Sequence, residues 1–63
     1  MKIIFYLYLI LVIDAQNYEV QKVPIMQDID CLQALDNIAQ YKKDVGYFYD
    51  NKLIMGYSCS YEN

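Results

Sequence analysis

The stretch IIFYLYLILVI, from Ile3 to Ile13, determines how much of this 63-residue chain is available for folding. It carries no charge, follows Lys2 and ends at Asp14. A basic start, an apolar run of about 7 to 15 residues and a small residue at the exit are typical of a secretory signal peptide. The sequence therefore predicts a removable signal peptide at residues 1–15, with cleavage after Ala15.

Two other interpretations of this stretch stay open. Eleven helical residues cover roughly 16 Å, whereas the hydrocarbon core of a membrane is about 30 Å thick, so a single span is disfavoured and only a short, uncleaved anchor fits. A buried strand over residues 3–13 is the third interpretation, because Ile, Val, Phe and Tyr suit a pleated sheet. Such a strand needs cover on both faces, and about fifty further residues supply little of it.

The two cysteines point to a covalent staple. Cleavage leaves a mature chain from Gln16 to Asn63, of 48 residues, which is near the lower size limit for a self-supporting core. In an exported chain, Cys31 and Cys59 allow one pairing, worth roughly 3.5 kcal/mol on the chain-entropy model. A metal or redox pair is disfavoured because the chain lacks a C-x-x-C motif and histidine.

A helix is the most secure element of the mature chain. Residues 16–27 look extended or like a weak strand, and Pro24 interrupts them. A single apolar stripe then predicts a helix of roughly 29–43, formed by Cys31, Leu32, Leu35, Ile38 and Ala39. Asp28 or Asp30 can cap its start, and Asp30 with Gln33 resembles a capping box. Lys42 and Lys43 would complement the dipole at its end.

A hairpin follows the helix. Residues 47–49 and 53–55 read as two strands around a turn of Asp50, Asn51 and Lys52. This register places Tyr49 opposite Leu53 and puts Cys59 on the face toward the helix. The fold class we expect is small α+β, with one amphipathic helix packed on a C-terminal hairpin over residues 28–63. Residues 16–27 are available as a third strand, and one disulfide crosslinks the domain.

Absences of residue types limit the chemistry. The chain has no His, Arg or Trp, which excludes Ser-His and Cys-His catalysis, histidine metal sites and arginine phosphate clamps. Its net charge of −3 provides no basic patch for nucleic acid. We expect neither enzyme activity nor a cofactor or metal, and interpret Asp28 and Asp30 as caps rather than calcium ligands. The dibasic pair Lys42-Lys43 leaves open whether a precursor is processed there.

Tyrosine is the remaining compositional signal, with eight residues in the chain. Tyrosine offers large, rigid contact area with a polar tip, which suits protein recognition as well as half-buried packing. With the hairpin tyrosines on the helix, Phe48, Ile54 and Tyr61 are the candidate binding surface. The leading hypothesis is a small secreted or periplasmic protein that occupies a protein partner, as an inhibitor, toxin-like effector or host-interaction protein. The alternative is an envelope protein tethered by an uncleaved apolar segment, acting in assembly or regulation; the oligomeric state stays open.

Overall fold

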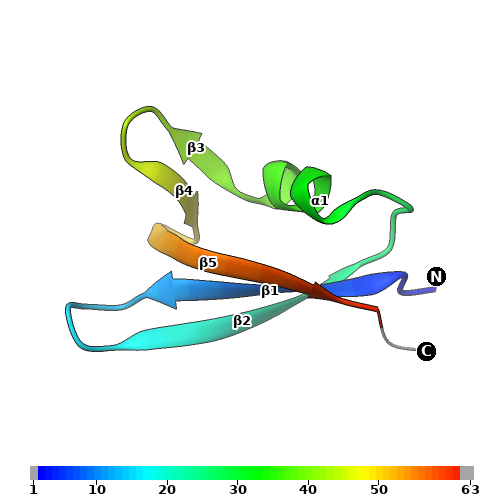
Figure 1. The fold of residues 1–63 in the computed structure, drawn as a ribbon, viewed down its shortest axis with the longest axis horizontal. Coiled ribbons are helices and arrows are strands. Elements are labelled where there is room, and N and C mark those ends of the chain that lie inside the picture. Colours follow the sequence, from blue (N-terminus) through cyan, green and yellow to red (C-terminus); the bar gives the residue numbers. More distant parts are fainter. Residues whose placement is uncertain (1, 62–63) are drawn as a thin grey trace.

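The computed structural model describes residues 2–61, which form a mostly antiparallel sheet of five strands and one short helix. The elements, in chain order, are β1 (Phe5–Val12), β2 (Tyr18–Ile25), α1 (Cys31–Ile38), β3 (Gln40–Lys42), β4 (Gly46–Tyr49) and β5 (Lys52–Ser60). Figure 1 shows β1, β2 and β5 as one layer, with α1 and the β3–β4 hairpin on a single side of it. Helix α1 is too short to cross a membrane, and it is the one helix among residues 2–61.

The strand order is β2-β1-β5-β4-β3, so the apolar run near the N-terminus is an interior strand, second from one edge of the sheet. It pairs antiparallel with β2 on one side and with β5 on the other, as in the buried-strand interpretation. In the structure α1 and β5 therefore pack against β1. The predicted cleavage after Ala15 would remove β1 from between β2 and β5.

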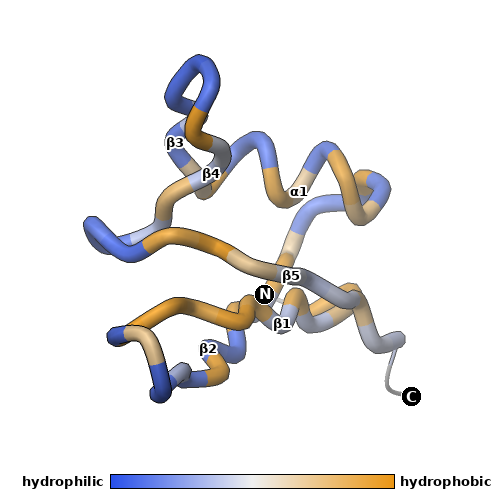
Figure 2. The backbone as a smooth tube through the Cα atoms, turned by 60° about the vertical axis from the view of Figure 1, so that its left-hand side comes forward, coloured by the Kyte–Doolittle hydropathy of each residue, from blue (hydrophilic) through white to orange (hydrophobic). Residues whose placement is uncertain are grey.

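Alternate residues of β1 build most of the core. Its burial alternates strictly along the strand, because successive side chains of a strand point to opposite faces. The buried residues are Phe5, Leu7, Leu9, Leu11, Ile25, Ala34 and Leu35. Four of these seven come from β1 and two from α1. Figure 2 shows the hydrophobic colours concentrated along β1 and the adjoining part of β5, whereas the turns are hydrophilic.

The sheet bends where β5 passes from one neighbour to the next. Its register against β1 shifts between Ile10, which faces Gly56, and Leu11, which faces Ile54. Two residues of one strand then correspond to one of the other, the arrangement of a β-bulge, which bends and twists a strand. Beyond the bend β5 pairs with β4, so the β3–β4 hairpin lies on the same side of the sheet as α1 (Figure 1).

The β4–β5 hairpin exists, but its turn is one residue shorter than the sequence predicted. Tyr49 faces Lys52 and Phe48 faces Leu53, which leaves Asp50 and Asn51 as a two-residue turn. Both turn residues have positive φ, 53° and 62°, as the mirror-image hairpin turns with matching twist require. Asp and Asn tolerate positive φ best among residues with side chains. The prediction of a three-residue turn ignored this preference.

Helix α1 is shorter than the predicted 29–43. Asp30 caps its start, because the Asp30 carboxylate accepts a hydrogen bond of 2.7 Å from the main-chain N–H of Gln33, as the sequence predicted. The helix ends at Ala39, whose backbone is extended, and the chain continues as β3. Lys42 therefore lies in a strand rather than at a helix end. Leu32, assigned to the apolar stripe, is 53% exposed, and Ala34 lies buried instead.

Candidate binding surface

Among residues 2–61, one face of the sheet carries neither α1 nor the β3–β4 hairpin (Figure 1). We call it the outer face and define it by the alternate residues of β1 and β2 that point away from α1. These are Tyr6, Tyr8, Ile10 and Val12 in β1, with their cross-strand partners Pro24, Lys22, Val20 and Tyr18 in β2. The β1 residues are half-buried, whereas Tyr18 is 65% and Val20 57% exposed. The outer face is thus an apolar and aromatic platform on two paired strands.

Lys22 is the one charged residue of the outer face. Its ammonium lies 4.1 Å from the centroid of the Tyr6 ring and 5.9 Å from that of Tyr8. A cation within about 6 Å of an aromatic face is attracted by the ring quadrupole. The lysine therefore lies flat across the tyrosines, and it adds a positive charge to one side of a molecule with a net charge of −3.

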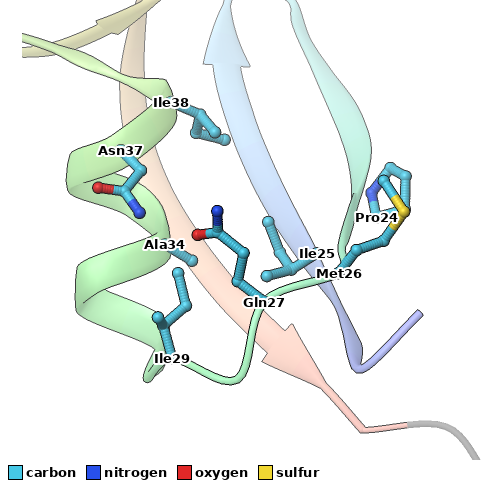
Figure 3. A pocket seen from close by; sticks show the side chains of 8 residues that line it. All are labelled: Pro24, Ile25, Met26, Gln27, Ile29, Ala34, Asn37 and Ile38. Carbon is cyan, nitrogen blue, oxygen red and sulfur yellow. The ribbon is translucent and has the colours of Figure 1, made fainter. Parts of the chain in front are cut away.

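The sheet carries one hollow beside the platform and another on its covered side. One, of about 350 Å³, lies at the β1–β2 turn beside Val12, Tyr18 and Met55. The other, of about 630 Å³, is a groove on the opposite side of the sheet, between α1 and the end of β2. Figure 3 shows Ile29, Ala34, Asn37 and Ile38 on its helix side and Ile25 and Pro24 on its strand side, with the Gln27 amide between them. The groove is mainly apolar.

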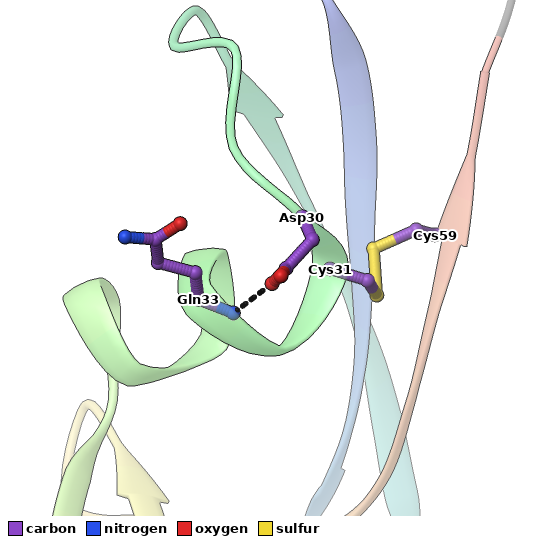
Figure 4. The surroundings of a disulfide bond; sticks show 4 residues. All are labelled: Asp30, Cys31, Gln33 and Cys59. Atoms are coloured by element: carbon purple, nitrogen blue, oxygen red, sulfur yellow. Dashed lines mark hydrogen bonds between the residues drawn. A yellow bond between two sulfur atoms is a disulfide. The ribbon is translucent and has the colours of Figure 1, made fainter.

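A disulfide joins α1 to the sheet, as the sequence predicted. Cys31, the first residue of α1, is bonded to Cys59 near the end of β5, with a Cα–Cα distance of 6.0 Å. Figure 4 shows the bridge beside the Asp30 cap. The first turn of α1 is therefore fixed both by the disulfide and by the hydrogen bond that the Gln33 N–H donates to the Asp30 carboxylate. Such a bond persists in an oxidising environment, extracellular or periplasmic.

Polar contacts tie the covered side of the sheet together. The Lys52 ammonium donates to the Glu19 carboxylate at 2.7 Å, which links β5 to β2 across β1, and this hydrogen bond raises the pKa of Lys52. The Tyr47 hydroxyl donates to the Asp36 carboxylate at 2.9 Å, which links β4 to α1. The same bond, with smaller contributions from desolvation and nearby charges, raises the pKa of Tyr47. Neither contact belongs to the outer face.

The expected cleavage point lies in the turn between β1 and β2, with Ala15 and Gln16 both exposed. The Asp14 carboxylate organises this turn, because it accepts hydrogen bonds from the side-chain amide of Asn17 at 2.9 Å and from the main-chain N–H of Gln16 at 2.8 Å. These bonds, the one from Asn17 first, lower the pKa of Asp14. A cut here would separate two strands that are paired along eight residues.

The candidate surface of Phe48, Ile54 and Tyr61 is not a single surface. The shortened turn moves Ile54 to the covered side, where it packs against the core. Phe48 lies in β4, with the Lys42 ammonium 4.5 Å from its ring centroid. Tyr61 follows β5, and its ring centroid lies 4.8 Å from that of Phe5. A binding role for these residues stays a prediction, whereas their grouping is wrong.

Sequence reasoning missed the outer face because half of it lies in the segment assigned to export. A signal was nevertheless present: Tyr6 and Tyr8 alternate with Phe5, Leu7 and Leu9, and a period of two is typical of a strand with two different faces. Residues 18–24 repeat this alternation more weakly. The continuous hydrophobicity of the first run obscured the pattern, because every position in it is apolar or aromatic.

Comparison with known proteins adds no identity: no family model matches the chain, and neither a curated protein nor a solved structure shows a significant match. Among residues 2–61, no three His, Cys, Asp or Glu side chains are grouped so that they could hold a metal ion.

Proposed function

We propose that this chain is a small non-enzymatic binding protein of an oxidising compartment, secreted or periplasmic, which acts by occupying a protein partner through its outer face. The observation that carries the proposal is the uncovered platform of β1 and β2. Exposed apolar patches rimmed by polar residues mark interaction sites on proteins of this kind. Tyrosines supply broad contact at low entropic cost, because each has only two side-chain torsions to fix.

The chemistry of the platform indicates the kind of partner. Lys22 is its one charge, whereas the acidic residues of the described chain lie in turns, in the segment before α1, on α1 or, for Glu19, on the covered side. A complementary surface is therefore apolar or aromatic at its centre and carries a carboxylate opposite Lys22. A phosphate backbone is a poor match, because one lysine offers little counterion release.

We further propose that the N-terminal segment is kept and works as β1. Leu7 and Leu9 are fully buried, and removal of β1 would expose both neighbouring strands. Ile13, three residues before the expected cleavage point, is bulkier than the small residue that signal peptidases favour there. The tethered alternative needs these same leucines in the membrane, and they cannot occupy the core and the membrane together. The disulfide supports an oxidising location independently of the segment.

A photo-crosslinking experiment tests the binding proposal. The full-length chain is made with photo-leucine in place of Ile10, at the centre of the outer face, or in place of Leu32, which is 53% exposed on α1. Each protein is irradiated with the secreted or periplasmic fraction of the source cells. We expect a saturable adduct of one defined mass, not equal to a second copy of the chain, from position 10 and not from position 32. Equal labelling from both positions, or none from position 10, would contradict the proposal.

A further inference from the structure

We infer that two copies of this chain pair through the free edges of their β2 strands, antiparallel and centred on Val20, so that the two outer faces join. β2 is an edge strand of eight residues, whereas the other edge, β3, has only three. A long free edge is a template for another strand. This inference goes beyond the proposed function and does not depend on it.

The β1–β2 ladder determines which main-chain N–H and carbonyl groups of β2 point toward its free edge. At the turn, the N–H of Ile13 donates to the carbonyl of Asn17 at 3.0 Å. Because bonded residues alternate along an antiparallel pair, odd-numbered residues of β2 bond to β1 and even-numbered residues face outward. Tyr18, Val20 and Lys22 therefore offer both N–H and carbonyl groups to a new strand. Residue 24 also faces outward, and as a proline it has no N–H to leave unpaired.

Proline fixes the register of the pairing. When the strands are centred on Val20, each Val20 faces its own copy and each Tyr18 faces Lys22 of the second copy. All three outward residues then pair, and Pro24 stays outside the ladder. A shift that centres the strands on Gln21 places Tyr18 opposite Pro24 at each end, and that pair lacks one hydrogen bond. The two registers make the same number of hydrogen bonds, but only the one about Val20 leaves no facing main-chain group unpaired, because in the shifted one the Tyr18 carbonyl faces a proline nitrogen that has no N–H.

Side chains agree with this register. A lysine on an edge strand usually discourages pairing, but the Lys22 ammonium lies over the Tyr6 ring on the outer face rather than across the edge. In the paired strands each Lys22 gains a further aromatic neighbour, the exposed Tyr18 of the other copy, at the spacing of cross-strand pairs. No like charges face one another, because Glu19 binds Lys52 on the opposite side of the sheet. The charges are thus self-complementary about the two-fold axis.

Sedimentation equilibrium of the oxidised full-length chain over a dilution series tests the inference. We expect a reversible dimer of twice the 7.5 kDa chain mass. N-methylation of the Val20 amide removes two central intermolecular hydrogen bonds and should raise the dissociation constant by about 10- to 100-fold. It takes nothing from the β1–β2 ladder, so the far-ultraviolet circular dichroism and the unfolding midpoint of the monomer should be unchanged.

A charge exchange tests the register itself. Tyr18→Lys alone should weaken the dimer by placing two lysines opposite each other in both pairs, and Tyr18→Lys with Lys22→Glu should restore it by creating two ion pairs. Lys43→Glu, in the exposed β3–β4 turn, is the control for the charge change and should leave the dimer as it is. A chain that stays monomeric at every concentration overturns the inference. So does a dimer that tolerates N-methylation at Val20, or one that the double variant does not restore.

Discussion

Leu7 lies directly opposite Cys59 in the register of β1 against β5, so the disulfide that holds the helix is anchored beside a completely buried leucine. The disulfide and the hydrophobic core therefore hold the helix to the sheet at the same position along β1 and β5. Cys31 fixes the start of α1 above this point, and Ala34 and Leu35 of the same helix complete the core. Loss of either the bridge or the β1 leucines should loosen the helix from the sheet.

Truncation of a buried β1 side chain should destabilise the full-length chain strongly. Leu9→Ala leaves a cavity in the core, and such changes cost about 2–5 kcal/mol. Ile13→Ala lies in the same apolar run but is 47% exposed, so it should cost no more than about 0.5 kcal/mol. Urea unfolding of both variants measures the difference. If the N-terminal run lay outside the fold, both variants would unfold like the parent chain.

Removal of the disulfide should lower the free energy of unfolding by roughly 3.5 kcal/mol, because the bridge closes a loop between residues 28 positions apart. The variant carrying Cys31→Ser and Cys59→Ser, unfolded in urea beside the oxidised parent, gives this value. Reduction of the parent chain should reproduce it and leave the double variant unaffected. A shift of the variant under reducing conditions would show that the cysteines do not account for the effect.

Acid should weaken the β1–β2 turn. The pKa of Asp14 is lowered in the folded chain by its bonds from Asn17 and Gln16, so the unfolded chain takes up the proton first as pH falls. The stabilisation is complete above the unfolded pKa of about 3.9 and is lost as pH falls through the folded value. Carboxyl chemical shifts over a pH titration should show this lowered midpoint. Asn17→Ala should return it toward 3.9, whereas Gln27→Ala should not move it.

How far the sequence predicts this fold depends on where local signals agree with the tertiary ones. The Asp30 cap and the pairing of Cys31 with Cys59 follow from local chemistry and from there being only two cysteines, and both are present. The helix end was wrong because Lys42 and Lys43 were interpreted as the dipole-matched last turn of the helix, whereas residues 40–42 pair with β4 as a strand. Strand pairing is a tertiary effect, and propensity over a short window does not capture it.

The outer face illustrates the second limit. Tyr6 and Tyr8 lie in a run whose composition suits export, anchoring and a buried strand, because all three use apolar residues, and the basic start and short length favoured export. Only the partners of the run distinguish them, and those partners, β2 and β5, come from both sides of the helix in the sequence. The two-residue turn at Asp50 and Asn51 was the smaller error, yet it moved Ile54 from one face of the sheet to the other.

The position of β1 between β2 and β5 also sets the order in which the chain is able to fold. β1 and β2 are close in sequence and join through a short turn, so this hairpin forms from local contacts. The other edge of β1 is paired only once β5, which ends at Ser60, is available. Such long-range pairing slows folding, because the intervening loop has to close first. While a ribosome or a translocation channel still holds about the last ten residues, β5 cannot pair with β1 and the sheet stays incomplete. The chain therefore completes its fold only after release.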